Sequence, residues 1–539
     1  MGLVRPNGQP ITQADVRRAR AQANVALGRS NEGASHRGTF AANWRAGIRS
    51  ADADSLPDRD VLVARSRDVV RNDGVATAAV QRRINSAVGF RWDLSSQPNA
   101  RALGIPFAAA RELGDQIESA WEQYAYGVHF TADAERTLTF GQLLRASAAH
   151  IFQDGEMVGL IEWAADEPTR YKTRLRLVDP DRLSNPQAKP DSALLRGGVE
   201  RNAAGVPVRY WIREGHPADL GATPNMTWRG WDRYSTPLGR PQVLHAFDKL
   251  RAGQSRGITR FASVLKGFRA LSRFTDATLE AATINALFVA FVKSNAGPSA
   301  VSESFGSEEL GEFASERSEY YKDNPVTLDG VQIPVLGLDD SVEMQTAARD
   351  TGGFDAFTRS IMRLIAAALG LTYEELSMDF SQTNYSSARA ALLIAWQETL
   401  ALRGLIEAQI AWPFFVAWLE EAFDLGEVEI PAGAPAFYDA VDAYAEGSWR
   451  GPGRGYIDPT KEIDAAAARI EAGVSSLEDE CSDQGRDWRD VAQKNARARA
   501  YYASLGEPYP GAGALASVGQ TARSPDHAAA LDAAPAAAR

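Results

Sequence analysis

The residue types best suited to nucleophilic chemistry gather in one stretch, FSQTNYSSAR, which spans residues 380–389. Ser386 or Ser387 could attack a carbonyl or phosphoryl group, but only beside a base that removes the hydroxyl proton. No lysine or histidine neighbours either serine, and the chain contains no G-x-S-x-G or G-x-x-x-x-G-K-[ST] motif. The second half of the stretch suits a helix start, with Asn384 as the N-cap. We therefore predict no catalytic residue here.

A second set of candidates is the carboxylates of Asp179, Asp181 and Glu200. If they converged on a divalent metal ion, the protein would be a nucleic-acid-processing hydrolase, because such ions activate water for attack on phosphate esters. However, Asp-Pro-Asp is typical of a turn after a strand, Glu200 lies in a predicted hairpin, and neither motif sits with a histidine. We keep the hydrolase as the alternative and predict no enzyme activity, metal ion or cofactor.

Cysteine and histidine usage also argues against a metal site. The single cysteine, Cys481, excludes a disulfide framework and a cysteine metal cluster, and it favours a reducing compartment. The six histidines are widely scattered and show no HxxxH or HxH pairing, the spacing that many zinc sites use.

Charge is unevenly distributed along the 539 residues, a length that predicts several domains. The net charge is -11, so the protein lacks the basic balance of a tight DNA binder, and any DNA should be guided rather than held. Residues 1–50 nevertheless carry eight arginines against two acids, which predicts a basic, flexible arm. Residues 438–490 carry thirteen acids against six bases, and the Ala/Pro-rich residues 505–539 predict a disordered tail.

Targeting and membrane signals are weak. Residues 1–30 are polar and arginine-rich, without the apolar core of a signal peptide. The longest apolar stretches are residues 281–292, which are too few to span a bilayer, and 404–419, which contain Glu407 and Pro413. We predict a soluble protein made in the cytoplasm, with no membrane partner. A ring-forming membrane or secretion adaptor is a third, weaker hypothesis, because a strongly amphipathic basic helix is also missing.

The first half of the globular region predicts an α+β domain. Apolar spacing of three and four predicts helices after residue 56, at 106–126 and at 139–152. Alternating residues then predict strands at 157–164, 174–180 and 241–248, with a hairpin at 197–214.

Long helices dominate the second half. One is predicted from about residue 258, with roughly 33 residues and a length of about 50 Å. It carries a charged stripe at helical spacing, basic first and acidic later: Lys266, Arg269, Arg273, Asp276 and Glu280. The stripe is either a solvated face with internal pairs, such as Arg273 with Asp276, or a functional surface. A small inserted module at 296–345 separates this helix from predicted helices at 354–369 and 386–419, the last interrupted near Pro413.

Six stretches, in order, resemble the lambda-type family of phage portal proteins. They are RSRDVVRNDGVA (65–76), LVDPDRL (177–183), GGVERNAAGVPVRYWI (197–212), VLHAFDKLRAGQSRGI (243–258), YEELSMDFSQTNYSSARAALL (373–393) and WRGPGRGYIDPTKEIDAA (449–466). The resemblance covers roughly residues 55–500. It does not extend to the basic arm or the Ala-rich tail.

The resemblance implies a multidomain portal architecture. After the basic arm, 1–55, the expected parts are a wing (56–255), a first stem helix (256–290), a clip (291–345), a second stem helix (346–372), a tunnel loop (373–388), a long helix leading to the crown (389–425), a helical crown (426–504) and the disordered tail (505–539). Two long helices flanking a small insert suit a stem with a clip at its tip.

The resemblance also implies a function. Such proteins form a ring, typically of twelve subunits, at a unique capsid vertex of the virion, and double-stranded DNA passes through the ring during packaging and ejection. The expected partners are the major capsid protein, the terminase large subunit and head-completion or adaptor proteins. Twelve chains of net charge -11 would carry about -132, a sign that suits a duct through which a polyanion slides.

Specific residues take roles from this resemblance. The tunnel loop would present short neutral polar groups to passing DNA, namely Gln382, Thr383, Asn384, Tyr385, Ser386 and Ser387. The charged stripe, from Lys266 to Glu280, would face the channel or pair with acids of the neighbouring subunit. We favour subunit pairing for at least one of its residues, because a closed ring needs heterologous contacts.

Overall fold

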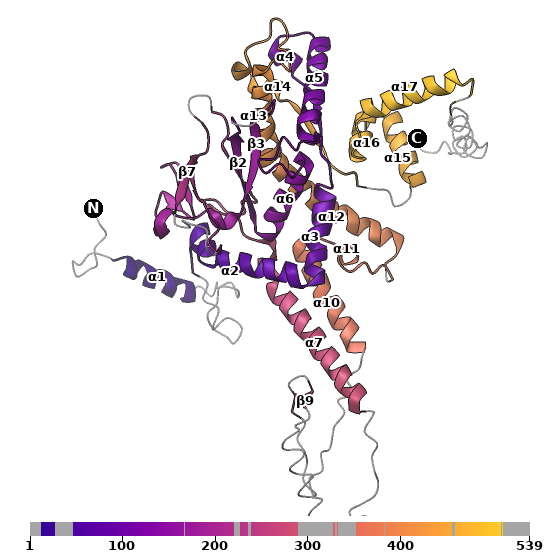
Figure 1. Cartoon of the computed structure of the whole chain (residues 1–539). Coiled ribbons are helices and arrows are strands. Elements are labelled where there is room, and N and C mark those ends of the chain that lie inside the picture. The colour runs from indigo at the N-terminus through magenta and orange to yellow at the C-terminus, as the bar shows by residue number, and fades with distance from the viewer. Residues whose placement is uncertain are drawn as a thin grey trace, which may run out of the picture.

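The protein is described from a computed structural model, which covers residues 12–26, 47–165, 168–219, 227–235, 239–288, 327–328, 331–332, 352–381, 383–454, 459–507 and 509. Helices and strands mix in one large body, from which a pair of helices projects (Figure 1). Most of the predicted clip and all but one residue of the predicted tail beyond residue 507 lie outside the described residues, as does most of the basic arm.

Helices form the frame of the body. They include α2 (Ala51–Asn72), α3 (Gly74–Ala87), α4 (Ala100–Leu103), α5 (Phe107–Tyr126), α6 (Phe140–Gln153) and α14 (Val441–Tyr444), while α1 (Gln13–Ala26) precedes the body in the chain. The predicted helices at 106–126 and 139–152 are confirmed within one residue. Their ends follow local signals, because Thr139 and Gln142 form a capping box at the start of α6.

The strands form small antiparallel sheets. The central sheet has the order β3–β2–β8, from β2 (Glu156–Trp163), β3 (Thr173–Val178) and β8 (Val243–Phe247). A second sheet joins β4 (Leu195–Arg196), β5 (Val199–Arg201), β6 (Pro207–Arg213) and β7 (Trp228–Asp232). Short pairs join β1 (Asp93–Ser96) to β11 (Gly447–Arg450), and β9 (Thr327–Leu328) to β10 (Val331–Gln332). The predicted α+β class is thus observed for the body.

An aromatic cluster joins distant parts of the chain in the core. Trp121 of α5 lies 5.0 Å from Trp418 and 5.6 Å from Trp449, measured between ring centroids. Edge-to-face aromatic contacts add to the hydrophobic stabilisation of such cores. Trp418 belongs to α13 (Trp412–Asp424) and Trp449 to β11, so segments near residues 412 and 450 complete a core begun by the first half of the chain.

The projecting pair consists of α7 (Leu265–Phe288) and α10 (Gly352–Leu369), which run side by side away from the body (Figure 1). The sequence predicted one helix from about residue 258. The structure instead has a 3-10 turn, η4 (Arg260–Ser263), before α7. The Thr259 hydroxyl accepts a hydrogen bond from the Phe261 amide at 3.1 Å and caps this separate turn. The 24 residues of α7 correspond to about 36 Å.

A long helical run follows α10. After α11 (Tyr373–Ser377), α12 (Tyr385–Ile406) continues through a π-helical turn, η5 (Glu407–Ala411), into α13. The predicted interruption near Pro413 is a widened turn just before it, and Pro413 itself sits in the first turn of α13, where proline is tolerated. By length and composition the run Ser387–Asp424 could cross a membrane. In the second half of this run Phe414, Phe415 and Trp418 are buried in the core, whereas Leu393, Ile394 and Leu400 of α12 are exposed.

Three further helices, α15 (Pro459–Glu471), α16 (Leu477–Asp483) and α17 (Trp488–Ser504), lie beside the body (Figure 1). The remaining short turns are η2 (Pro180–Arg182), η3 (Pro186–Ala188) and η6 (Phe437–Asp439).

Candidate functional site

The charged stripe of α7 is fully on the outside of the single chain. Its five residues, Lys266, Arg269, Arg273, Asp276 and Glu280, are all exposed. Among the described residues none of the five forms an ion pair, so the Arg273–Asp276 pair that a solvated face could contain is not formed. The closest contact is a 3.5 Å hydrogen bond from the Ser272 hydroxyl to Asp276. The stripe therefore presents unpaired charges over about 21 Å of helix.

The opposite face of α7 packs on α10. The Phe274 ring lies 4.2 Å from the Phe357 ring and 5.5 Å from the Phe354 ring, between centroids. Nearer the body, Phe268 and Ile365 are buried. The apolar face thus holds the two helices together, and the charged face is left for solvent or another molecule.

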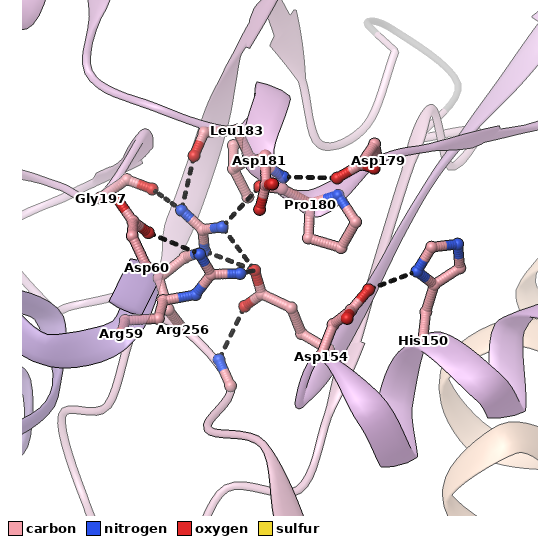
Figure 2. A network of polar contacts seen from close by, with 12 residues as sticks. Arg59, Asp60, His150, Asp154, Asp179, Pro180, Asp181, Leu183, Gly197 and Arg256 are labelled. Atoms are coloured by element: carbon pink, nitrogen blue, oxygen red, sulfur yellow. Dashed lines mark hydrogen bonds and ion pairs between the residues drawn. The ribbon is translucent and has the colours of Figure 1, made fainter. Parts of the chain in front are cut away.

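A buried arginine, Arg256, anchors the chain just before α7 (Figure 2). It donates to the carbonyl oxygens of Leu183 and Gly197 at 2.6 Å and of Pro180 at 2.9 Å. It also donates to the Glu156 carboxylate, at 2.7 Å from Nε. Five donors of one guanidinium in a rigid fork can satisfy such a set, whereas lysine cannot.

Glu156 is the centre of this network. Its carboxylate is fully buried and also accepts hydrogen bonds from Arg59 at 2.7 Å and from the Gly257 amide at 2.7 Å. Burial acts to raise the pKa of Glu156, but the charges of Arg256 and Arg59 outweigh it and hold that pKa well below its ordinary value. His245 lies 3.1 Å away, and burial lowers its pKa. The network therefore favours ionised Glu156 beside a neutral imidazole.

The backbone crosses closely at the same point. A Cβ atom on Gly257 would lie 2.0 Å from the Gly155 carbonyl oxygen, and one on Gly155, whose φ is +92°, would lie 2.2 Å from the Ile258 carbonyl carbon. Both positions require glycine. The start of the projecting helix pair is therefore locked to the β2 turn.

The C-terminal end of α10, where this helix returns to the body, is held by a second buried arginine, Arg83 of α3. It donates to the carbonyl oxygens of Leu369 at 3.1 Å and of Gly370, and to the Thr399 hydroxyl of α12 at 3.0 Å. A cation at the C-terminus of α10 satisfies carbonyls that the helix leaves without partners. Each helix of the pair is thus fixed to the body by one guanidinium.

The loop 378–384 is organised by local hydrogen bonds. Asn384 caps α12 by accepting from the Ser387 amide at 2.9 Å, as the sequence predicted. The Thr383 hydroxyl donates to Glu374 at 2.9 Å, and the Asp379 carboxylate accepts from the Tyr373 hydroxyl at 3.2 Å. Gln382 and the side chains of Tyr385 and Ser386 lie outside the described residues. Asp379 also accepts from the Ser381 amide at 3.0 Å and interacts with its hydroxyl, but no described lysine or histidine side chain contacts a serine hydroxyl in this loop.

The carboxylates of the alternative hypothesis do not converge as a set of three. The ligand atoms of Asp179 and Asp181 lie within 4.8 Å of each other and of His216, which the sequence analysis missed as a neighbour. Nε2 of His216 is 3.5 Å from Asp181, although 35 residues separate them in the chain. Glu200 is not in this group, and its carboxylate accepts from the Trp211 indole at 3.0 Å.

Arg67 already compensates these acids. Its guanidinium contacts Asp154 at 2.9 Å, Asp179 at 3.0 Å and Asp181 at 2.8 Å. Although burial acts to lower it, hydrogen bonding and the charge of Asp154 raise the pKa of Arg67. The two aspartates therefore have a fixed cation from the protein itself, and the Asp179 side chain also caps the η2 turn.

Sequence reasoning missed the buried arginines. Arg59, Arg83 and Arg256 sit in stretches that look like ordinary polar surface, and their partners are 97, 286 and 100 residues away. One signal was visible, since Glu156 comes directly before the apolar residues MVGLI of its strand, and a charge there demands a partner.

Comparison with known proteins identifies the family. Residues 37–403, more than half of the chain, match the family model described as phage portal protein, lambda family. The chain is 33% identical over 464 residues to portal protein B of Escherichia phage lambda, covering 84% of this chain and 86% of that protein. It is 33% identical over 463 residues to the portal protein of Escherichia phage N15, with the same coverage.

Among solved structures, the chain resembles one in the virion of a native gene transfer agent particle, with a TM-score of 0.39, 15% identity and coverage of 80% of this chain and 99% of that chain. A chain in the neck of an empty particle of the same kind has a TM-score of 0.42 and 15% identity, with the same coverage.

The sequence matches define a class of protein, the phage head–tail connectors, whose members are structural rather than enzymatic. The chain belongs to the lambda family of phage portal proteins. It is therefore a portal protein, and its place is in the virion, at the portal vertex of the capsid. The expectation drawn from the six sequence stretches is confirmed at this level.

Proposed function

We propose that copies of this chain form a ring, of twelve subunits as is typical of the family, whose central channel carries double-stranded DNA during packaging and ejection. The observation that carries the proposal is the projecting helix pair in a chain of this family. Its inner face is packed and its outer face is a stripe of unpaired charges. Such a surface needs solvent, neighbouring charges or a polyanion to face it.

The parts of the chain take the roles that the family architecture gives them. Residues 56–255 act as the wing, 256–290 and 346–372 as stem helices, and 291–345 as the clip that docks the terminase large subunit and later the head-completion proteins. Residues 373–388 act as the tunnel loop, 389–425 as the long helix to the crown, and 426–504 as the crown. Two arginines, Arg256 and Arg83, support this division because each ties one stem helix to the body.

The charged stripe of the stem could face the DNA channel or pair with acids of the neighbouring subunit. We favour pairing between subunits for at least one of its residues. Basic Lys266, Arg269 and Arg273 lie near the body, whereas acidic Asp276 and Glu280 lie further along α7. A neighbouring α7 displaced along the axis would bring opposite charges together, and such heterologous contacts close a ring. In the loop, Thr383, Asn384 and Ser387 are neutral, so they would exchange weak hydrogen bonds with phosphates without trapping DNA.

The ring is tested by negative-stain images of the purified full-length protein. We expect rings with a central channel. In a packaging reaction with capsids and the terminase of the same phage, we expect DNA to become protected from nuclease in an ATP-dependent way. A protein that stays a monomer or dimer at every concentration would overturn the proposal. The hydrolase alternative is the weaker one, because the Arg67 guanidinium already pairs with both Asp179 and Asp181.

A further inference from the structure

The helices α15, α16 and α17 form a C-terminal module, residues 459–507, that has no apolar core in the single chain. Among its described residues, the buried side chains are the charged Glu462 and Asp487. A helical unit needs an apolar face packed on something, because helix propensity alone rarely stabilises helices of this length. The module lies beyond residues 37–403, which the family model matches.

Two of its helices carry exposed apolar faces. On α15, Ile463 is 58% exposed and Ile470 is 38% exposed; they lie seven residues apart on one face, which Val474 extends. On α17, Tyr501 is 65% exposed and Leu505, just past the helix end, is 57% exposed; these are four residues apart and share a face. Isolated exposed apolar residues are ordinary, but two aligned faces on a unit without a core indicate a missing partner.

The two faces carry opposite charge. Residues 459–483 contain seven acids and two bases, a net charge of -5, whereas residues 488–504 contain four bases and one acid, a net charge of +3. Asp464 and Glu471 flank the isoleucines of α15, and Lys494 and Arg497 lie on the face of α17 that carries Tyr501. The α15 face and the α17 face are therefore complementary in charge and alike in apolar content.

These flanking charges are not used within the chain. Among the described residues, none of Asp464, Glu471, Lys494 and Arg497 forms an ion pair; Arg497 only reaches Gln493 on its own helix, at 3.4 Å. By contrast, Arg469 pairs with Glu480 at 2.6 Å and fixes α15 to α16. The internal pairs hold the module together and leave the flanking charges available.

The module is attached to the body beside the start of α17, and α16 adds a hydrogen bond from the Gln97 amide to Glu478 at 3.0 Å. Asp487, the N-cap of α17, pairs with Arg450 of β11 at 2.6 Å, and both side chains are more than 90% buried. Gly485 approaches the body as well, because a Cβ there would lie 2.5 Å from the Gly451 carbonyl oxygen. From this anchor α17 extends away from the body (Figure 1). Its far end, with Tyr501 and Leu505, is thus available to another molecule.

We propose that the acidic, isoleucine-bearing face of α15 binds the basic, tyrosine-bearing face of α17 in the neighbouring copy of this chain. The inference rests on the proposed ring and assigns one of its interfaces. Because the two faces differ, the contact is heterologous, and repeated head to tail around a ring it leaves neither face uncovered. DNA is a weaker occupant for the basic face, since the module as a whole is acidic and apolar Tyr501 and Leu505 would stay exposed.

Two charge-reversal variants of the full-length protein test the contact. The first is Asp464→Lys with Glu471→Lys, and the second is Lys494→Glu with Arg497→Glu. For each alone, we expect the concentration at half assembly, measured by sedimentation, to rise about tenfold or more, because like charges then oppose each other across the interface. Arg101→Glu with Arg111→Glu, two exposed arginines of α4 and α5, is the matched control and should assemble as the wild type does.

Mixing the two variants separates a contact between copies from one within a chain. In an alternating ring, each reversed face meets a face of opposite sign, so the equimolar mixture should assemble within about threefold of the wild-type concentration. Folded variants that assemble normally alone, or that do not recover on mixing, overturn the inference. The inference is also overturned if Lys494→Glu with Arg497→Glu assembles normally but loses affinity for a 30-base-pair DNA duplex, because the basic face would then bind DNA. If the wild type itself forms no ring, the proposed function fails instead.

Discussion

Arg256 donates from Nε to the Glu156 carboxylate at 2.7 Å, and both side chains are buried where the body meets the stem helix α7. Three other groups converge on Glu156: the guanidinium of Arg59, the amide of Gly257 and the imidazole of His245. A buried charge network whose carboxylate is paired on several sides fixes geometry strictly, even though Nε of Arg59 has no partner here. We infer that this network sets the direction in which the stem leaves the body.

Removing Arg256 should therefore cost far more than an ordinary arginine substitution. In Arg256→Met, Glu156 loses its main partner and three carbonyls lose a donor, and we expect the free energy of unfolding to fall by about 3–5 kcal/mol. Arg256→Lys should be nearly as damaging, because an ammonium cannot reach the same acceptors. Urea denaturation followed by tryptophan fluorescence measures both.

Arg251 provides the control for that substitution. It lies five residues earlier and pairs with Asp54 at 2.6 Å, but both side chains are about half exposed. Arg251→Met should cost less than about 1 kcal/mol. Equal losses for the two arginines would mean that the Glu156 network does not hold the junction.

Acidification should weaken the protein in two stages. The pKa of His245 lies below its ordinary value of 6.5 in the folded state, so its contribution is complete above pH 6.5 and is lost as the pH falls below that value. The pKa of Glu156 lies well below 4.5, so its contribution is lost only as the pH falls below 4.5. Urea midpoints at pH 7.5, 5.5 and 4.0 should fall in that order.

Substitutions separate the two stages. In His245→Gln the urea midpoint should change little between pH 7.5 and 5.5, because glutamine has no proton to gain in that range. His129→Gln, which changes an exposed histidine, should leave the pH dependence of the urea midpoint as it is in the wild type. A wild-type midpoint that does not change between pH 7.5 and 5.5 would contradict the buried neutral state of His245.

The sequence predicted the parts of the fold that depend on local periodicity. The helix predicted at 106–126 and the strand at 157–164 are found within one residue, since their apolar spacing and flanking residues suffice. The α7 start was wrong by seven residues, because the crossing of Gly155 and Gly257 that imposes the preceding turn joins positions 102 residues apart. Contacts of that range leave no periodic signal.

The candidate site divides in the same way. Asn384 was predicted as a cap from the residues beside it, and it is one. His216 was not associated with Asp181, because the pairing depends on where the chain after β6 places His216 relative to η2. The three buried arginines were also invisible, since burial of a guanidinium depends on acceptors supplied by the rest of the fold.

The stem stripe is tested by Arg269→Glu. Arg269 is exposed and unpaired in the single chain, so the variant should fold with a free energy of unfolding within about 0.5 kcal/mol of the wild type. In particles, reversal of one charge per subunit should reduce either ring assembly or the amount of DNA packaged. Arg101→Glu is the control on a surface far from the stem in sequence. If Arg269→Glu changes neither readout, the stripe is only a solvated face.

The last prediction concerns metal ions at Asp179 and Asp181. Because Arg67 contacts both aspartates and Asp154, the wild type should have the same melting temperature, within about 1 °C, in EDTA and in millimolar Mg²⁺ or Mn²⁺. In Arg67→Ala the three carboxylates repel one another, so we expect a loss of several kcal/mol that divalent ions partly restore. A wild-type melting temperature that rises by several degrees with Mn²⁺ would instead show a resident cation site. Phosphodiester cleavage by the wild type, lost in Asp181→Asn, would then revive the hydrolase hypothesis.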